Sequence, residues 1–255
     1  MLNRKQLIGA NFSFQHHPFR WTAEHLCAMG FDRMELWGIA PHLDLFHDSR
    51  AQLAEVKAIL SDNGLTVRCF TPEQVLYPVN IASGHRSNRE ASVGRFLHAA
   101  DICAELGATY LFLTPGRGFE CESRDIALAH SVASINRIAA HARNLGVSCL
   151  LEPLQRVESN IVTNANELYA LWRALDDEHI DVVLDLVVMA TAGHLAWGDG
   201  DLPLGDYLAE LGAHGFTGTL TFEPFGNGSS ALDPVSNWRR CLDAVAPDFN
   251  QAEQA

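Results

Sequence analysis

The chain has 255 residues, of which 47% are hydrophobic and 19% are charged, and its 31 acidic and 18 basic residues give a net charge of −13. This composition supports one globular core and excludes a disordered or fibrous protein. The negative charge disfavours binding to nucleic acid or to an anionic membrane, because both carry negative charge themselves. We therefore expect a single domain over residues 1–249 and a short flexible tail over 250–255.

Cysteine spacing and hydropathy narrow the class of protein further. The six cysteines form no C-x-x-C pair, which argues against a zinc ribbon and against a disulfide-rich secreted scaffold. The first ten residues lack a signal-peptide pattern, and no stretch approaches the roughly 18 apolar residues that a membrane span requires. These features predict a soluble, cytoplasmic protein with reduced thiols.

Short apolar runs alternate with helical patterns along the chain, and glycine or asparagine marks most of the joins. The predicted strands cover about 6–14, 33–37, 66–71, 110–114, 147–151, 180–189 and 217–222. The predicted helices cover about 22–29, 50–62, 88–106, 124–145, the stretch from Asn164 or Asn166 to about 175, 204–211 and 234–245. This order predicts a parallel βα fold with one strand fewer than a closed (β/α)8 barrel, and the Gly- and Asp-rich stretch 189–202 is typical of a loop.

Three carboxylates stand at the ends of predicted strands, where functional residues of parallel βα folds collect: Glu152, Asp185 and Glu223. Glu152 and Glu223 each precede a proline, which removes a backbone N–H that would otherwise satisfy the acid locally. Such a cluster is unfavourable unless a cation or shared protons neutralise it, and a hard divalent metal ion is the natural partner. The alternative is that each acid caps a helix or pairs with an arginine.

Further candidates follow other predicted strands. Glu158 lies in the loop after Glu152 and is a candidate substrate contact, or else a surface acid paired with Arg156. Aromatic and polar side chains after the second and third strands suit a sugar-binding site, although core packing is the alternative role for such a tryptophan. These additional candidate substrate contacts are Trp37, His42 and Glu73.

At these residues the sequence resembles the sugar isomerase and epimerase family that shares the xylose-isomerase-like TIM barrel, and within it the fructoselysine 3-epimerase and D-tagatose 3-epimerase branch. The resemblance covers nearly the whole chain. The matching stretches are Met34-Glu35-Leu36-Trp37-Gly38 with Pro41-His42, Thr71-Pro72-Glu73, Arg89-Glu90, Leu151-Glu152-Pro153-Leu154, Glu158-Ser159-Asn160, Asn164-Ala165-Asn166, and His194 with Trp197-Gly198-Asp199-Gly200.

The resemblance implies a TIM-type (β/α)8 barrel and a metal-dependent isomerase. Carried over to this chain, it implies that a divalent ion (Mn²⁺, Co²⁺ or Mg²⁺) is held by Glu152, Asp185 and Glu223, and that Glu158 binds substrate. The implied reaction removes a proton next to the carbonyl of a ketose or ketosamine and passes through an enediolate, with Glu152 and Glu223 exchanging acid and base roles. The implied partners are a small-molecule sugar and further copies of the chain, without nucleic acid or membrane.

One departure from the family pattern affects the site. The family places a sixth helix and a seventh strand with a metal-binding histidine after the aspartate strand, and this chain is truncated there, so that Asp185 is followed closely by His194. His194 is the candidate substitute ligand. Two alternative functions therefore stay open: a non-catalytic relic with an incomplete metal site, and an AP-endonuclease-like DNA repair enzyme, which the charge of −13 disfavours.

Overall fold

A curved sheet of six parallel strands forms the centre of the protein. The computed structural model describes residues 2–46, 50–75, 79–186, 195–197, 200–224 and 233–250. The strands follow one another in the sheet in chain order. They are β2 (Gly9–Ala10), β3 (Arg33–Gly38), β4 (Thr66–Pro72), β5 (Tyr110–Leu113), β6 (Ser148–Leu151) and β7 (Ile180–Val182).

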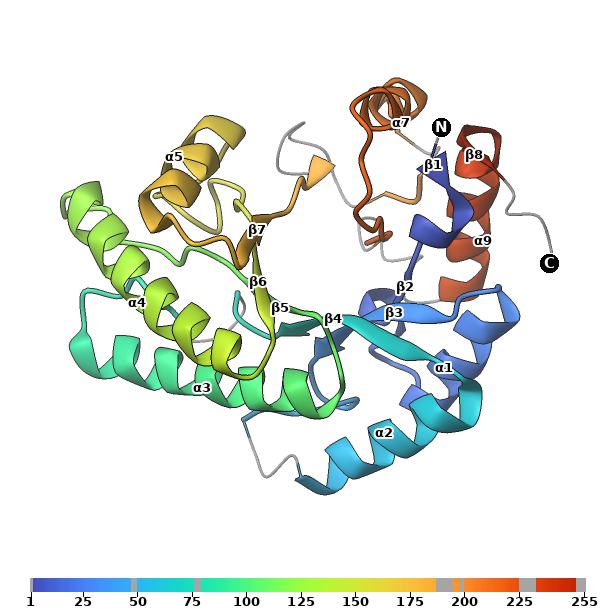
Figure 1. Cartoon of the computed structure of the whole chain (residues 1–255), viewed down its shortest axis with the longest axis horizontal. Helices are drawn as coiled ribbons and strands as arrows, with labels where there is room; N and C mark the ends of the chain where they lie inside the picture. The colour runs from blue at the N-terminus through green and yellow to red at the C-terminus, as the bar shows by residue number, and fades with distance from the viewer. Residues whose placement is uncertain are drawn as a thin grey trace.

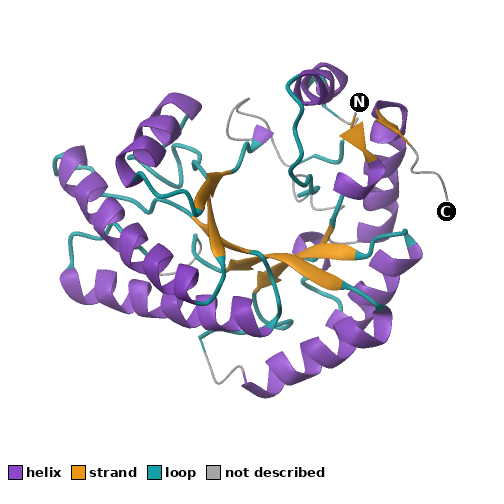
Figure 2. Cartoon of the chain, in the orientation of Figure 1, coloured by secondary structure: helices purple, strands orange, loops and turns teal. Residues whose placement is uncertain are grey.

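The helices lie outside this sheet, in an incomplete ring around it (Figure 1). Figure 2 shows the strands at the centre and the helices at the periphery. None of the described helices is long and apolar enough to span a membrane. The helices are α1 (Phe19–Ala28), α2 (Arg50–Asn63), α3 (Arg86–Glu105), α4 (Arg124–Asn144), α5 (Ala165–Leu175), α7 (Leu204–Ala213) and α9 (Pro234–Val245), with short 3-10 turns η1 (Arg4–Gln6), η2 (Phe12–Phe14) and η3 (Ala246–Asp248).

Local sequence explains why most helices end where predicted. Gly107 and Gly146 adopt positive φ angles of 68° and 75° after α3 and α4, a conformation that glycine takes without strain. Ser123 begins α4 by accepting a hydrogen bond from the backbone N–H of Asp125 at 3.3 Å. Capping residues of this kind are visible in the sequence, and the predicted helices therefore match those of the structure to within a few residues.

The first predicted strand is shorter than expected because Asn11 replaces part of its backbone pairing. The Asn11 side chain accepts from the backbone N–H of Trp37 at 2.7 Å and donates to the Trp37 carbonyl at 3.0 Å. The chain can therefore turn into η2 directly after β2 while its polar groups stay satisfied. This side chain fixes the carboxyl end of β2 against β3.

The end of the chain packs against its beginning. Leu220 forms a parallel bridge with Leu7, in which the Ile8 N–H donates to the Leu220 carbonyl at 2.9 Å. β1 (Leu2–Asn3) pairs in parallel with β8 (Phe249–Asn250), an element that the sequence does not indicate. Trp238 of α9 is fully buried, with ring centroids 5.3 Å from Phe222 and 5.5 Å from Phe31. These contacts join the last helix to the first βα unit.

Among the described residues, no strand lies between β7 and the segment around Leu220. In the part of the chain that the structure describes, β7 pairs only with β6. Val182 and Leu184 are 48% and 51% exposed beside the open edge. The strand predicted from 180 to 189 ends at Val182, with 187–189 outside the described residues, and the strand predicted over 217–222 is reduced to the bridge at Leu220. The opening lies where the sequence predicts the truncation around helix 6 and strand 7.

Candidate active site

A cavity of about 860 Å³ lies inside the curved sheet. Its wall consists of residues from β3 to β7, the segment 215–223, and the helices α5 and α7. The charged side chains among its described lining residues are Arg68 and the acids Glu35, Glu152, Asp181, Asp185 and Glu223. The three carboxylates predicted from strand ends therefore share one cavity.

Backbone contacts position the two Glu-Pro pairs. The N–H of Glu152 donates to the Leu113 carbonyl at 3.0 Å, which extends the β5–β6 pairing by one residue, and Pro153 is buried directly after it. On the other side of the opening, Glu223 follows the fully buried Phe222, and the Ser13 hydroxyl donates to the Pro224 carbonyl at 3.3 Å. Both glutamates are thus held at the carboxyl end of the barrel wall.

Burial and like charge act together on these carboxyl groups. Burial raises the pKa of Glu152 well above its ordinary value, and the negative charges of Asp185, Glu223, Glu35 and Glu158 raise it further. The pKa of Glu223 is also raised well above its ordinary value by burial and then by the charges of Asp185, Glu35 and Glu158. The cluster therefore favours a state in which some of its carboxyls hold protons.

Glu158 lies near this cluster but has a local structural role. Its carboxylate accepts from the backbone N–H of Gln155 at 3.0 Å, which closes the turn after β6. It is not among the residues that line the cavity. Its charge nevertheless raises the pKa of both Glu152 and Glu223, so it lies within electrostatic reach of the candidate site. Its role in substrate binding stays a prediction.

Glu35 also belongs to this cluster of acids. It is part of a stretch that matches the family pattern, but sequence reasoning does not identify it as a candidate acid of the site. It lies in β3, is only 7% exposed, and accepts a hydrogen bond from the Thr71 hydroxyl at 2.5 Å. Burial raises the pKa of Glu35 to about 7, although the Thr71 hydrogen bond opposes this effect. The signal in the sequence is a single acid between Met34 and Leu36, since a charged residue within an apolar strand faces either solvent or a cavity.

Trp37, His42 and Glu73 form a separate buried group. The Trp37 indole N–H donates to Glu73 Oε2 at 3.1 Å. His42 Nδ1 lies 2.8 Å from Asn11 Nδ2, and His42 Nε2 lies 2.8 Å from the His17 carbonyl. These partners require a neutral ring protonated at Nε2, and burial accordingly lowers the pKa of His42. None of the three lines the cavity, and their assignment as substrate contacts stays a prediction.

The donor chemistry of the cavity suits a hard divalent cation, because Glu152, Asp185 and Glu223 all provide carboxylate oxygens. Within the described ranges, no three Asp, Glu, His or Cys side chains form a group that could hold a metal ion. His194 lies outside the described residues. The described residues thus provide suitable oxygen donors without completing a coordination group.

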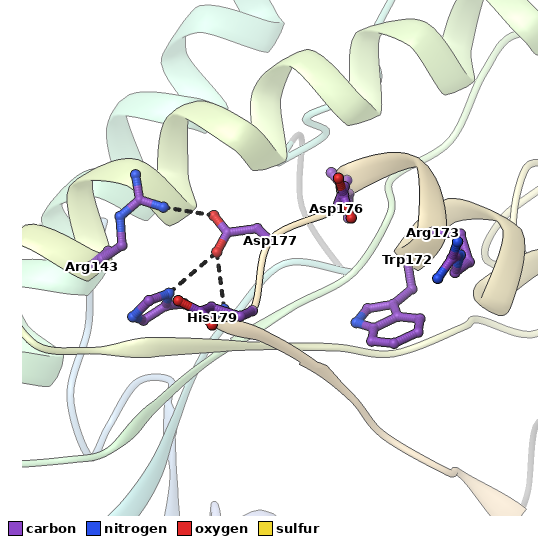
Figure 3. Close-up of a pocket in the computed structure, with 8 residues that line it drawn as sticks. Arg143, Trp172, Arg173, Asp176, Asp177 and His179 are labelled. Atoms are coloured by element: carbon purple, nitrogen blue, oxygen red, sulfur yellow. Dashed lines mark hydrogen bonds and ion pairs between the residues drawn. The ribbon is translucent and has the colours of Figure 1, made fainter.

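A second cavity of about 710 Å³ lies at the amino end of β7 (Figure 3). Asp177 joins its walls, with Oδ2 3.0 Å from Arg143 Nη1 of α4 and Oδ1 3.4 Å from His179 Nδ1. Asp177 and His179 precede β7, whereas Glu152 follows the parallel strand β6, so Asp177 and Glu152 lie at opposite edges of the sheet. Trp172 of α5 lines both cavities. We interpret the second cavity as part of the packing between α4, α5 and β7.

Comparison with known proteins relates this arrangement to sugar epimerases. The chain is 28% identical over 156 residues to fructoselysine 3-epimerase of Escherichia coli O157:H7, which covers 61% of this chain and 55% of that relative. It is 22% identical over 246 residues to ketose 3-epimerase of Arthrobacter globiformis, covering 86% of this chain and 82% of the relative. Because the match spans only about half of the first relative, that protein's activity is a proposal for this chain.

Solved structures support the fold at low sequence identity. L-ribulose 3-epimerase superposes with a TM-score of 0.79 at 18% identity, covering 95% of this chain and 94% of that one. Two neighbours were solved with metal: IOLI protein with a zinc atom, at a TM-score of 0.76, and a TIM barrel protein from Mycobacterium smegmatis with magnesium, at 0.70. At 14% identity both show the fold alone. A family model described as xylose isomerase-like TIM barrel matches residues 23–193, and the chain therefore belongs to the xylose isomerase-like TIM barrel family.

Proposed function

We propose that this protein is a sugar epimerase that inverts the carbon next to the carbonyl group of a ketose or ketosamine. The observation that carries the proposal is the pair Glu152 and Glu223, which line one cavity from separate walls and both have pKa values raised well above the ordinary range. Relatives that are named ketose 3-epimerases and fructoselysine 3-epimerases support it. The finer points of metal dependence and mechanism are part of the proposal.

Epimerisation needs one carboxylate that removes a proton and one carboxylic acid that returns a proton to the opposite face of the same carbon. One ionised glutamate takes the proton from the carbon, and the electron pair of the C–H bond moves toward the carbonyl oxygen to give an enediolate. The other glutamate then donates its own proton from the other side, which restores the carbonyl with inverted configuration. Mutual repulsion favours a singly protonated pair, and this is the state that the reaction requires.

We also propose that Glu152, Asp185 and Glu223 hold a divalent cation such as Mn²⁺, Co²⁺ or Mg²⁺, with His194 as a further candidate ligand. When bound, such a cation polarises the carbonyl and hydroxyl oxygens of the sugar. The three carboxylates would then orient the sugar carbon between Glu152 and Glu223. A homo-oligomer in the cytoplasm, with neither nucleic acid nor membrane as a partner, completes the proposal.

Deuterium incorporation tests the proposed chemistry directly. The metal-supplemented protein is incubated with D-fructose in D₂O, and loss of the proton signal next to the carbonyl is followed by NMR. We expect exchange with the unchanged protein and a loss of at least about 100-fold in Glu223→Gln and in Glu152→Gln, because each variant removes one acid–base group. Glu120→Gln is the matched control, since Glu120 is exposed and pairs with Arg117 away from the cavity.

Two outcomes contradict the proposal in different ways. Full exchange in a folded Glu223→Gln variant overturns the assignment of the two glutamates. Absence of exchange by the unchanged, metal-supplemented protein with D-fructose and with a ketosamine favours the non-catalytic alternative. A cooperative melting transition of each variant, at a temperature no lower than that of the unchanged protein, excludes loss of folding as the reason for lost exchange.

A further inference from the structure

The cavity continues from the carboxylates through the open side of the sheet. No described strand lies between β7 and the segment around Leu220, so the inner faces of α5 and α7 border the same cavity as Glu152 and Glu223. We call the part between these helices the lateral branch. Its lining residues from the two helices are Ala165, Leu168, Tyr169 and Trp172 of α5 and Tyr207, Leu208 and Leu211 of α7.

The lateral branch has an apolar and aromatic surface. The Trp172 indole N–H is already used, because it donates to the Ile180 carbonyl at 2.7 Å. The rings of Tyr169 and Trp172 lie 6.0 Å apart at an angle of 36°, and Tyr169 is 61% exposed. Sugar hydroxyls gain few hydrogen bonds on such a surface and lose those that they make with water. An apolar or aromatic group suits it better.

The charges around the cavity further restrict its occupant. The described lining residues include five acids and one basic residue, Arg68. The Arg68 guanidinium donates to Thr109 Oγ1 at 2.8 Å and stacks on the Tyr110 ring. Asp206 and Glu210 are exposed on α7 beside Tyr207 and Leu211. These charges disfavour an anionic group. They also oppose entry of a second copy of this chain, whose own net charge is −13.

We propose that the sugar substrate carries an apolar or aromatic substituent, attached through a neutral or positively charged linkage such as an amine, and that this substituent binds in the lateral branch. The sugar lies at Glu152 and Glu223, and the substituent extends between α5 and α7. This inference rests on the proposed function, because it assigns a substrate class to that site. It assigns a role to the space between β7 and the segment around Leu220, where no described strand lies.

Binding of matched ketoses tests the inference. The probes are 1-(benzylamino)-1-deoxy-D-fructose, D-fructose and D-fructose 6-phosphate, and affinities are measured by calorimetry on the metal-supplemented protein. We expect the benzyl conjugate to bind at least about tenfold more tightly than D-fructose, and the phosphate to bind more weakly. Equal affinity for the conjugate and D-fructose, or tightest binding of the phosphate, overturns the inference.

Three variants locate the substituent. Tyr169→Ser and Tyr207→Ser each remove one aromatic wall of the lateral branch, and we expect the preference for the benzyl conjugate over D-fructose to fall toward one. Ile126→Ser is the matched control, because Ile126 is 50% exposed on α4 and does not line the cavity. If the preference survives in both tyrosine variants, the substituent binds elsewhere and the inference is wrong.

Benzyl alcohol separates this inference from the proposed function. Quenching of tryptophan fluorescence reports its binding near Trp172 without any sugar. Saturable binding that is weakened in Tyr169→Ser and Tyr207→Ser supports the lateral branch even if D-fructose is not a substrate. No saturable binding of benzyl alcohol, or a dimer by light scattering that Leu184→Asp dissociates, overturns it in favour of an empty or copy-filled opening.

Discussion

Glu35 shows, for a single residue, how burial controls the chemistry of this cavity. The Thr71 hydroxyl donates to its carboxylate, yet burial still raises the pKa of Glu35 to about 7. An acid with a raised pKa in the folded state binds more protons there than in the unfolded chain over the interval between the two pKa values. The free energy of unfolding therefore decreases as the pH rises through that interval.

Glu35→Gln should remove the part of this pH dependence that Glu35 contributes. The glutamine amide oxygen still accepts from Thr71, and the side chain no longer ionises. We expect the stability of the unchanged protein relative to the variant to fall by about 3 kcal/mol at most between pH 4.5 and pH 8, measured by urea unfolding after chelation of metal. A stability difference that is the same at both pH values contradicts the assigned titration.

Two kinds of acid in this cavity differ in how visible they are in the sequence. Glu152 and Glu223 each stand between an apolar run and a proline, so their places at strand ends could be predicted. Glu35 lies within a strand, and its direction depends on the register of β3 against β4, which shifts between Met34 and Glu35. A pattern in one strand does not contain that register, because it is set by the neighbouring strand.

At the scale of helices and strands, capping residues decide how well the sequence predicts where a helix begins. The sequence pattern allows either Asn164 or Asn166 to cap the start of α5. In the structure the cap is Asn164, whose side chain accepts from the Glu167 N–H at 3.1 Å. The Glu167 carboxylate in turn accepts from the Thr163 N–H at 2.8 Å. Only the position whose backbone is extended before the helix can make this cap, and Asn164 has φ −160° and ψ 169°.

Replacing this cap should lower stability at one position and not at the other. We expect Asn164→Ala to reduce the free energy of unfolding by about 1 kcal/mol, since the Glu167 N–H loses its partner. Asn166→Ala is the control, because Asn166 is exposed within the first turn of α5 and alanine is a better helix former. Urea unfolding curves of the two variants measure the difference, and an equal loss in both contradicts the cap assignment.

Strand lengths were predicted less well than helix limits, for a physical reason. The apolar run from 180 to 189 predicts a long strand, but β7 ends at Val182, and Leu220 forms only a bridge within the predicted strand 217–222. A strand is defined by its hydrogen-bonded neighbours, and in the described chain these two segments face an opening where a neighbour is missing. A helix makes its hydrogen bonds internally, so its limits can be read from its own residues.

At the scale of the whole molecule, contacts between the two ends of the chain hold the segments around the cavity together. The pairing of β1 with β8 and the burial of Trp238 against Phe222 and Phe31 join the two ends of the chain. These contacts bring the segment that carries Glu223 next to β2, while Glu152 directly follows β6 on another wall of the cavity. The carboxylates therefore line one cavity although no described strand lies between β7 and the segment around Leu220, and their repulsion is a property of the whole fold.

This repulsion gives a prediction with two opposite signs. A cation that binds only the folded chain stabilises it by about 2.7 kcal/mol at 100 times its dissociation constant, which corresponds to a rise of roughly 5–10 °C in melting temperature.

Asp185→Asn removes a charge that raises the pKa of Glu152 and Glu223. We therefore expect this variant to melt at a higher temperature than the unchanged protein without metal, and to gain less from added Mn²⁺. Asp206→Asn, an exposed change on α7, should alter neither value. Differential scanning calorimetry with chelator and with Mn²⁺ measures all four cases. If Mn²⁺ does not shift the unchanged protein, its carboxylates do not form a metal site, and the non-catalytic alternative gains support.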